Sequence, residues 1–396
     1  MTGNLKHSGL ILVSGVDAKG ITEKLFNILA PFQIQIVDFE QVVIRDRLLL
    51  TVLINLDPAH QNAVEEDLNK GFANSGLDIA IDFAEPQSYT PSNSNLHVVL
   101  MAKVLSPIAI SKVAVTIGKF KGNIDRVRRT ASFPITALEF DVTASLDEIQ
   151  LKNLQRELGQ ISHDVNIDIA VQRGGLTRRS KKVVLLDMDS TLIREEVIDL
   201  IALKFGVGDK VAVITESAMR GEIDFETSLR NRVSLLKGAD ESLLSQVAEE
   251  ITLTPGARTL IATLHKLGHK VGVVSGGFLN VIEPLLNSLK IDFYKANILE
   301  IQNGKLTGNL LGAIIDREAK ADSLREFAKA EGVELSQTIA IGDGANDLGM
   351  IEIAGLGVAF NAKPKVKSVA DTSINTPYLD SVLYLMGITR EEVEAE

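Results

Sequence analysis

The sequence contains no cysteine, which excludes disulfide bonds, cysteine-ligated zinc sites and thiol catalysis. It also lacks any apolar stretch close to the roughly 20 residues that a transmembrane helix needs. The first part of the chain has only a short apolar run, broken by Ser14, Gly15 and Asp17, so it does not have the pattern of a signal peptide. We therefore expect a soluble, cytoplasmic protein.

Basic residues are outnumbered by acidic ones, 41 against 52, and the net charge is −11 at pH 7. Such a surface repels the phosphates of nucleic acids and of anionic lipids, so we expect neither nucleic acid nor a membrane as a partner. With 45% hydrophobic and 23% charged residues the composition is that of a globular protein. At 396 residues the chain is too long for one ordinary core, which predicts two or three domains.

The first part of the chain has the pattern of a small α/β domain. A buried strand is predicted at 9–14, and apolar residues at helical spacing predict a helix over Ile21–Leu29, closed by Pro31. Segments rich in β-formers follow at 34–39, 41–44 and 48–53, and a second helix is predicted at about 59–72. The order β-α-β-β-α-β predicts a ferredoxin-like fold.

The same pattern recurs further along the chain. Strands are predicted at 97–104, 124–130, 137–144 and 165–172, and helices at 108–117, after Pro107, and at 146–158. We therefore expect two βαββαβ domains, over residues 1–86 and 95–172. A segment rich in Pro, Ser and Asn, Glu85–Asn95, joins them, and a Gly-rich basic linker over 173–182 follows the second domain.

From residue 183 to residue 396 the pattern changes to alternating strands and helices. Apolar strands are predicted at 183–186, 271–274, 338–341 and 356–360. This alternation predicts an α/β domain with a mainly parallel sheet between helices, a Rossmann-like core. A helical insert without strands, at about 195–254, is predicted to form a cap over the edge of that sheet.

Several of these strands end in polar residues, and sites in open parallel sheets form at the carboxyl ends of strands. A carboxylate cluster without histidine or cysteine suits Mg²⁺, and a hydroxyl, glycine amides and a lysine can hold a phosphate. One carboxylate could attack phosphorus, and a second could donate and accept the proton. Each motif alone is as well explained by a capping turn or a loop, but their joint order predicts a magnesium-dependent phosphoryl-transfer site. The motifs are Asp187-Met188-Asp189-Ser190-Thr191, Ser275-Gly276-Gly277, Lys320, and Gly342-Asp343-Gly344-Ala345-Asn346-Asp347.

This set resembles the haloacid dehalogenase superfamily, whose motifs are Asp-x-Asp-x-Thr, a Ser or Thr, a Lys, and Gly-Asp-x-x-x-Asp. The resemblance implies that Asp187 is the nucleophile and Asp189 the general acid and base. It places Mg²⁺ on Asp187, the main-chain carbonyl of Asp189, and Asp343. It further implies phosphate binding by Ser275, Gly276 and Lys320, support from Thr191 and from Asp347, which would orient Lys320 or a metal-bound water, and a place near the site for Asn346.

The cap contains residues suited to a small zwitterion, because an acid binds an ammonium and an arginine grips a carboxylate. Glu196 and Arg232 could supply these groups, although taken alone they are better explained as a surface acid and a solvated arginine. Taken alone, Met219 and Phe225 are more typical of a cap core than of a ligand-binding wall. The run nevertheless resembles the phosphoserine phosphatase family, in which Asp-x-Asp-Ser-Thr, a following Glu, Ala-Met-x-Gly-x-x-x-Phe and a later Arg line the pocket. The resemblance implies hydrolysis of O-phospho-L-serine to L-serine through an aspartyl-phosphate, the last step of serine biosynthesis.

The N-terminal repeats resemble ACT domains, which pair and bind amino acids at their interfaces. The turn Gly15-Val16-Asp17-Ala18-Lys19-Gly20 carries the resemblance in the first copy, although Asp17 is equally consistent with an ordinary helix N-terminal residue. The second copy has Leu105-Ser106-Pro107 there and no Gly-x-Asp. The resemblance implies a homodimer and binding of L-serine near Gly15, Asp17 and Gly20, which would restrain catalysis.

Three other functions stay open from the sequence. The enzyme could transfer the phosphoryl group to another alcohol, or act on another small phosphate ester or on a phosphoprotein. The chain could also be an amino-acid-sensing regulator with a vestigial phosphatase half. Intact acids at Asp187, Asp189 and Asp343, together with Lys320, argue against that last possibility.

Overall fold

The computed structural model describes residues 7–84, 95–175, 178 and 180–395, without the side chain of Met219. The chain forms two compact units, Met1–Pro91 and Ser92–Glu396, and each is described by itself. Most of the predicted linker at 85–95, and residues 176, 177 and 179 of the predicted basic linker, lie outside the described residues. Among the described residues, no helix has the length and apolar character needed to cross a membrane.

The first unit is a four-stranded antiparallel sheet with two helices on one face. Its order is β1-α1-β2-β3-α2-β4, as the sequence predicts, and the strands lie in the order β2-β3-β1-β4. The core holds Leu25 and Leu68 from the helices against alternate residues of β1 and β3. The two segments predicted at 34–39 and 41–44 form one strand. The bounds are β1 His7–Val16, α1 Ile21–Leu29, β2 Ile34–Ile44, β3 Arg47–Leu56, α2 Gln61–Phe72 and β4 Leu77–Ala84.

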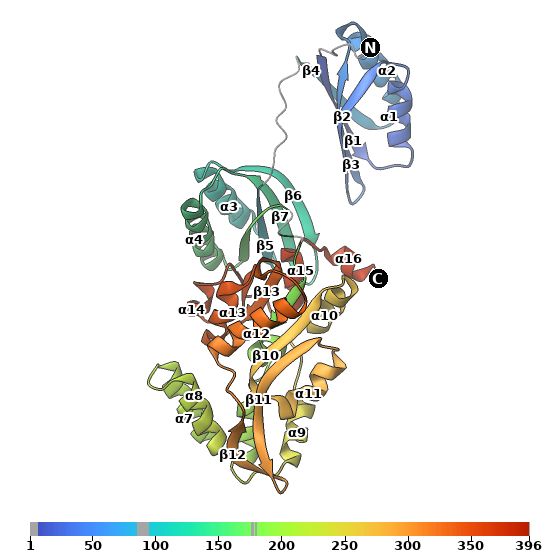
Figure 1. The fold of residues 1–396 in the computed structure, drawn as a ribbon. Coiled ribbons are helices and arrows are strands. Elements are labelled where there is room, and N and C mark those ends of the chain that lie inside the picture. The colour runs from blue at the N-terminus through green and yellow to red at the C-terminus, as the bar shows by residue number, and fades with distance from the viewer. Residues whose placement is uncertain (1–6, 85–94, 176–177, 179, 396) are drawn as a thin grey trace. The chain divides into compact units, whose positions relative to one another are not determined.

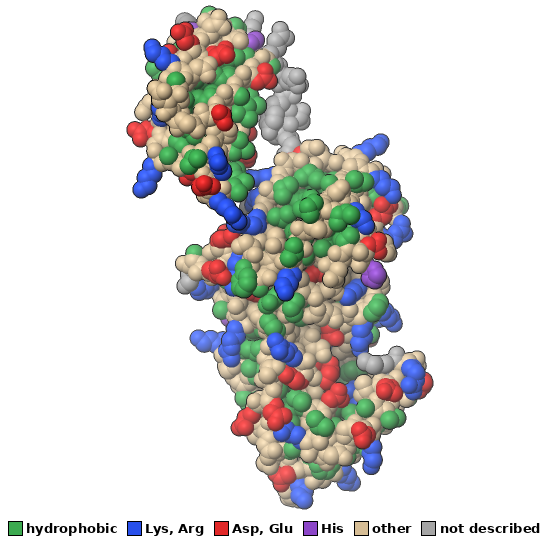
Figure 2. All heavy atoms as spheres, turned by 180° about the vertical axis from the view of Figure 1, so that it is seen from behind, with side chains coloured by type: hydrophobic (Ala, Val, Ile, Leu, Met, Phe, Trp, Pro, Cys, Tyr) green, Lys and Arg blue, Asp and Glu red, His purple; other side chains and the backbone are tan. Residues whose placement is uncertain are grey.

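The other face and the β2 edge of this sheet carry exposed hydrophobic side chains. Leu49 is 49% exposed and Val43 is 43% exposed, whereas Leu50, on the helix side of the same strand as Leu49, is fully buried. Figure 2 shows hydrophobic side chains on the surface of this unit. Residues along these strands therefore alternate between buried and exposed positions, but the exposed positions carry hydrophobic rather than polar side chains.

The second unit begins with a second βαββαβ module of the same topology. Its strand order, β8-β5-β7-β6, repeats the order β4-β1-β3-β2 of the first unit. Helix α4 runs to Val165, beyond its predicted end at 158, and ends at Asn166, which has a φ of 52°. The predicted last strand therefore starts late, at Asp168. The bounds are β5 Leu96–Ala102, α3 Pro107–Lys119, β6 Asn123–Ala131, β7 Thr136–Thr143, α4 Glu148–Val165 and β8 Asp168–Arg173.

This second module is joined to the C-terminal α/β domain by one continuous sheet of 11 strands. Strand β8 pairs with β15 (Thr372–Ile374) of the α/β domain at Ala170 and Thr372. Val99, Met101 and Ala137, on the module's outer face, belong to the same buried cluster as the α/β core. Strand β5 is therefore buried on both faces, which explains its largely apolar sequence, LHVVLMA, interrupted only by His97.

The α/β domain has the predicted parallel core. Strands β9, β10, β13 and β14 correspond to the four predicted strands and lie in the order β10-β9-β13-β14. The hairpin β11–β12 and strand β15 were not predicted, although the turn Asn303-Gly304, with φ values of 53° and 73°, carries the usual hairpin signal. The bounds are β9 Val183–Leu186, β10 Lys270–Phe278, β11 Phe293–Gln302, β12 Lys305–Leu311, β13 Thr338–Gly342 and β14 Gly357–Phe360.

Helices surround this sheet and form the insert. Figure 1 shows α7 and α8 as a pair set off from the sheet strands. The isolated bridge between Asp240 and Lys305 ties the insert to β12. The insert helices are α6 Val197–Phe205, α7 Gly208–Met219, α8 Phe225–Ser234 and α9 Ser242–Glu250. The others are α10 Ala257–Lys266, α11 Leu279–Ser288, α12 Arg317–Ala330, α13 Leu348–Ile353, α14 Pro364–Lys367, α15 Val382–Leu385 and α16 Arg390–Glu394.

Candidate active site

The predicted polar residues meet at the carboxyl ends of three neighbouring strands. Strands β10, β9 and β13 are adjacent and parallel, so Ser275, Asp187 and Asp343 come to the same edge of the sheet. The four apolar residues of β9 are fully buried, and Asp187 follows them with only 4% of its surface exposed. The strand therefore places the carboxylate of Asp187 at the edge of the buried core.

Lys320 is fully buried and lies between two of the acids. Its Nζ is 2.6 Å from Oδ1 of Asp187 and 2.6 Å from Oδ1 of Asp347. Asp316 caps helix α12, which carries Lys320, by accepting the amide of Ala319 at 2.9 Å. The position of this ammonium group is thus fixed by a capped helix and by two carboxylates.

Asp347 holds the loop that carries Asp343. Its Oδ2 accepts the amides of Asp343 at 3.1 Å and Gly344 at 2.9 Å, while Oδ1 accepts Lys320. Both oxygens of this fully buried carboxylate are therefore used. The contacts make Asp347 the residue that fixes both Lys320 and the turn after β13.

The acids outnumber the ammonium group in this confined space. Burial raises the pKa of Asp187 well above its usual range, the charges of Asp347 and Asp343 raise it further, and Lys320 opposes them. Burial, followed by the charges of Asp347 and Glu196, raises the pKa of Asp343 to about 7. Burial lowers the pKa of Lys320, but Asp187 and Asp347 outweigh it and hold that pKa above its usual value. A cation bound among these acids would relieve their mutual repulsion.

The donor set fits a hard divalent cation. Single carboxylate oxygens of Asp187, Asp343 and Asp347 all lie within 4.8 Å of one another. The set contains oxygen and no histidine or thiolate, which favours Mg²⁺ or Ca²⁺ over transition metals. The carboxylate of Asp189 is not in this group, so a contribution from that residue would come from its main-chain carbonyl.

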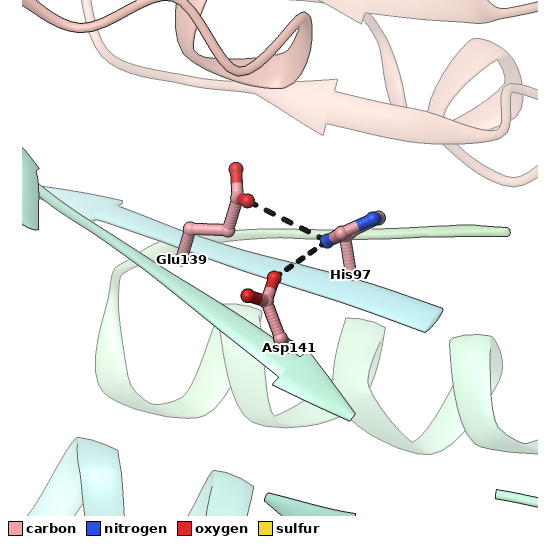
Figure 3. A group of neighbouring side chains, drawn as sticks. All are labelled: His97, Glu139 and Asp141. Atoms are coloured by element: carbon pink, nitrogen blue, oxygen red, sulfur yellow. Dashed lines mark hydrogen bonds and ion pairs between the residues drawn. The ribbon is translucent and has the colours of Figure 1, made fainter. Parts of the chain in front are cut away.

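A second acidic group lies in the second βαββαβ module, and it does not fit a cation. Figure 3 shows the imidazole of His97 between Glu139 and Asp141, with Nδ1 at 3.5 Å and 2.8 Å from their oxygens. Both oxygens of Glu139 already accept guanidinium groups, from Arg128 and from Arg178. Two fixed positive charges on the central carboxylate would repel a metal ion, so this is a structural ion-pair network.

Asp189 lies in a tight turn after Asp187. The next residue, Ser190, has a φ of 55°, and Oδ1 of Asp189 accepts the amide of Val197 at 3.0 Å. The hydroxyl of Ser275 lies 3.4 Å from Oδ2 of Asp189. Burial, with the charge of Glu196, raises the pKa of Asp189 to about 7. A carboxyl group that titrates near neutral pH is suited to donate and accept a proton.

The glycine loop after Ser275 is held by a residue that the sequence analysis missed. Asn297, on β11, donates its amide to the carbonyl of Gly276 at 2.8 Å and accepts the amide of Ile315 at 2.9 Å. The hydroxyl of Ser275 accepts the amide of Gly277 at 2.8 Å. Asn297 is 2% exposed. The sequence analysis did not predict β11; had it done so, an asparagine in a strand next to β10 would have pointed to this role.

The insert reaches the site through Phe225 and Glu196. A Cβ added at Gly276 would lie 3.1 Å from Cζ of Phe225, so this ring covers the glycine loop. Ser190 donates to Oε1 of Glu196 at 2.8 Å. Burial lowers the pKa of the half-buried Arg232, and Asp199, Glu196 and Asp189 oppose this shift. Glu196 and Arg232 therefore lie close enough for the charge of Glu196 to affect the pKa of Arg232.

The remaining predicted residues of this region are placed as follows. Thr191 is fully buried, and its Oγ1 has no hydrogen-bond partner among the described residues. Asn346 is half-buried in the turn that precedes Asp347. Met219 is the last residue of α7, but its side chain is outside the described part of the chain.

The predicted regulatory turn belongs to the first unit. Gly20 precedes α1 with a φ of 88°, where a side chain would be strained, and the amide of Asp17 donates to the carbonyl of Asp46 at 2.8 Å. A cavity of about 160 Å³ next to this turn is lined by Gly20, Lys24 and Phe72, among others. The turn is therefore beside a small cavity within its own unit.

Comparison with known proteins identifies the class. Residues 184–352 match the haloacid dehalogenase-like hydrolase family, and residues 8–82 and 94–172 each match an ACT domain family. These matches cover the α/β domain from β9 to α13 with its insert, and both βαββαβ modules. The fold and its four motifs are thus those of a haloacid dehalogenase-like hydrolase that follows two ACT domains.

Full-length relatives identify the family. The chain is 47% identical to a phosphoserine phosphatase of Streptomyces coelicolor over 98% of this chain and 93% of that protein. The unliganded crystal structure of a probable phosphoserine phosphatase from Vibrio cholerae is 36% identical, with a TM-score of 0.59 over 78% of this chain and 90% of that one. A structure described as a phospho-aspartyl intermediate analogue of phosphoserine phosphatase is 44% identical, with a TM-score of 0.50 over 52% of this chain and 98% of that one. The chain belongs to the phosphoserine phosphatase family.

Proposed function

We propose that this protein hydrolyses O-phospho-L-serine to L-serine and inorganic phosphate, the closing step of a route to serine. The observation that carries the proposal is the position of Lys320, fully buried between Asp187 and Asp347 and beside the loop of Asp343. A lysine and several acids that converge on one strand end make a site for a phosphate and a metal ion. Membership of the phosphoserine phosphatase family supports the choice of ester.

In the proposed reaction Asp187 is the nucleophile. Its carboxylate attacks phosphorus, the bond to the serine oxygen breaks, and an aspartyl-phosphate forms. Asp189 gives its proton to the leaving serine oxygen and later takes a proton from the water that attacks the aspartyl-phosphate. The similar structure that carries a phospho-aspartyl analogue supports this two-step course.

Ser275, the amide of Gly276 and Lys320 would bind the phosphate oxygens. Asp187, the carbonyl of Asp189 and Asp343 would hold Mg²⁺, whose charge would stabilise the negative charge that spreads over the phosphoryl group. Asp347 keeps Lys320 in place through its 2.6 Å contact. Thr191, fully buried in the same turn, would support the position of Asp189.

The cap residues would select the serine part of the substrate. Glu196 would bind the ammonium, and Arg232 would grip the carboxylate with two parallel hydrogen bonds. Phe225, which covers Gly276, would exclude water, and Met219 and Asn346 would complete the wall of the pocket. A phosphate ester without either charged group would then bind more weakly.

The test is phosphate release from O-phospho-L-serine and from two similar esters. Phosphoethanolamine lacks the carboxylate, and 3-phosphoglycerate lacks the ammonium. We expect a kcat/KM about 10- to 100-fold higher for O-phospho-L-serine, because each lost charge contact costs roughly 1.5–3 kcal/mol. Equal rates with all three would leave the phosphatase chemistry standing and refute the substrate. Transfer of phosphate to an added alcohol in place of water would favour a phosphotransferase.

We also propose that L-serine binds the first unit near Gly15, Asp17 and Gly20 and inhibits the enzyme, and that the chain forms a homodimer. The cavity beside Gly20 and the exposed apolar edge strand β2 support these two proposals. Asp17→Asn is expected to weaken serine inhibition without changing kcat. Light scattering that gave a monomer mass at micromolar concentration would refute the dimer.

A further inference from the structure

A cavity of about 380 Å³ lies between the second βαββαβ module and the α/β domain. Its walls come from β6, Arg178 and Lys181, the turn before β10, and the chain on both sides of Gly387. Both β9 and β10 start beside it, so it lies at the amino-terminal edge of the parallel strands. The candidate active site is at the opposite, carboxyl-terminal edge. The cavity has the size of a small-molecule site.

One side of the cavity is cationic, and Arg178 forms its fixed part. Arg178 donates two hydrogen bonds to Glu139, at 3.1 Å and 2.6 Å, and one to the carbonyl of Leu385 at 3.0 Å. These bonds link the module to the end of the α/β domain. Because its donors are engaged, Arg178 shapes the wall and supplies charge, but it is not the principal ligand-binding group.

Arg128 has unused hydrogen-bonding capacity in the same cavity. Its Nη2 donates to Glu139, whereas its buried Nε has no hydrogen-bond partner within the described ranges. The side chain is 39% exposed, so a ligand in the cavity can reach the outer part of the guanidinium group, although Nε itself is buried.

The opposite wall adds a second unpaired atom and a second cation. Nδ1 of His269 is buried and likewise has no partner in the described part of the chain. Burial, with the charge of Lys182, lowers the pKa of His269, which favours the neutral ring. Lys181 is 6% exposed, and its Nζ donates to the carbonyl of Ser336 at 2.6 Å. Burial lowers its pKa, and the charge of Asp371 opposes this shift. Leu267 and Ile388 give the cavity an apolar surface.

We propose that this cavity binds a small metabolite that carries one carboxylate. Arg128 would bind the carboxylate, Lys181 would add positive charge to the wall, His269 would hydrogen-bond a hydroxyl of the ligand, and Leu267 would contact its carbon atoms. A single negative charge fits better than a phosphate dianion, because Glu139 and Glu392 already surround the arginines with negative charge. This site is independent of the proposed reaction.

The absence of tryptophan from the chain permits a direct test. Leu267, 49% exposed at the rim of the cavity, is replaced by tryptophan in the full-length protein, which gives one local fluorophore. L-Serine, glycerate and ethanolamine, which share a hydroxylated two-carbon core, are then titrated. We expect a saturable change at about millimolar concentration with serine and glycerate and none with ethanolamine. An equal response to ethanolamine, or no saturable response to any of the three, would overturn the proposal.

Two arginine variants distinguish the cavity from other sites. Arg128→Gln in the Leu267→Trp protein should weaken binding about tenfold, whereas the neighbouring Arg129→Gln, which loses only its exposed pair with Glu391, should leave it unchanged. Equal binding by both variants would overturn the proposal. Circular dichroism of both variants identifies a loss of fold separately. In NMR spectra of the unaltered protein, which has six histidines, the bound ligand should shift the ring resonances of His269. The His269→Gln variant assigns these resonances.

Discussion

The ammonium group of Lys320 lies 2.6 Å from a carboxylate oxygen of Asp187, and both side chains are buried at the end of β9. The sequence separates the two residues by 133 positions. The contact exists because α12 and β9 bring a lysine and an acid to the same strand edge. The same lysine also contacts Asp347, so one cation neutralises part of a cluster of acids.

Lys320→Ala is expected to abolish activity and to destabilise the protein. Without the ammonium, the buried carboxylates of Asp187 and Asp347 lose their common partner, which costs about 3–5 kcal/mol of unfolding free energy. We expect kcat/KM to fall at least about 1,000-fold. Chemical denaturation and phosphate release measure the two effects. Lys329→Ala, at the exposed end of the same helix, is the control and should change neither.

Arg232→Lys tests the proposed grip on the substrate carboxylate. A lysine keeps the charge but loses the planar fork, so KM for O-phospho-L-serine should rise about tenfold or more, while kcat changes little. KM for phosphoethanolamine, which has no carboxylate, should stay the same. Arg230→Gln lies on the same helix but pairs with Glu226 at the surface, and it is the matched control. A similar rise of KM for both esters would contradict the assignment.

The raised pKa values predict that Mg²⁺ releases protons when it binds near pH 7. In the metal-free protein Asp189 and Asp343 have pKa values of about 7, mainly through burial, and are partly protonated at that pH. Metal binding requires the ionised form of Asp343. Calorimetry at pH 7 in two buffers of different ionisation enthalpy should give different heats, and the difference should vanish at about pH 9. Heats independent of the buffer at pH 7 would contradict this prediction.

The same pKa values determine how the stability of the metal-free protein depends on pH. A carboxyl whose pKa is higher in the folded than in the unfolded state binds more protons when folded, between its usual value of 3.8 and about 7. The contribution of Asp343 to the unfolding free energy should therefore fall as the pH rises through that interval. In EDTA, Asp343→Asn should remove this part of the decline, which denaturation at pH 5 and pH 8 would measure.

We expect the contribution of Glu139 to the unfolding free energy to depend on pH in the opposite direction. Burial raises its pKa, but hydrogen bonds from His97 and Arg178 and the arginine charges outweigh burial and hold the pKa far below its usual 4.5. Its contribution is complete above pH 4.5 and is lost as the pH falls toward the folded-state pKa. Glu139→Gln should cost about 3 kcal/mol at pH 7 and less in acid. Glu148→Gln, which removes an exposed pair with Arg173, should cost no more than ~1 kcal/mol.

The position of the second βαββαβ module predicts where the chain can be shortened. Its sheet shares a buried cluster with the α/β domain, and Asp168 accepts the amides of Asn375 and Thr376 at 2.8 Å and 2.9 Å. A chain that starts at residue 95 should therefore fold and keep its activity. A chain that starts at Lys182 should aggregate or unfold, because it exposes the surface that Val99 and Met101 cover. Circular dichroism and phosphate release on both chains test this difference.

The residues that the sequence predicted best are those with local signals. An apolar strand followed at once by Asp-x-Asp predicts both the strand and the place of Asp187 and Asp189, and the repeat of the βαββαβ pattern predicts both modules. Asn297, Glu139 and Asp168 were missed because their partners are distant in the sequence. The hairpin around Asn303 had a local signal that was overlooked, and the largely apolar sequence of β5 pointed to burial on both faces.

The central claim of the account is that Asp187 carries the phosphoryl group during the reaction. The most direct measurement is rapid acid quench of the protein with O-phospho-L-serine and Mg²⁺, followed by mass spectrometry of the peptide that contains residues 183–194. The account predicts one phosphoryl group on Asp187 within the first turnover, and none in Asp187→Asn, which should also be inactive. Hydrolysis at the normal rate by Asp187→Asn, or a phosphoryl group on another residue, would contradict it.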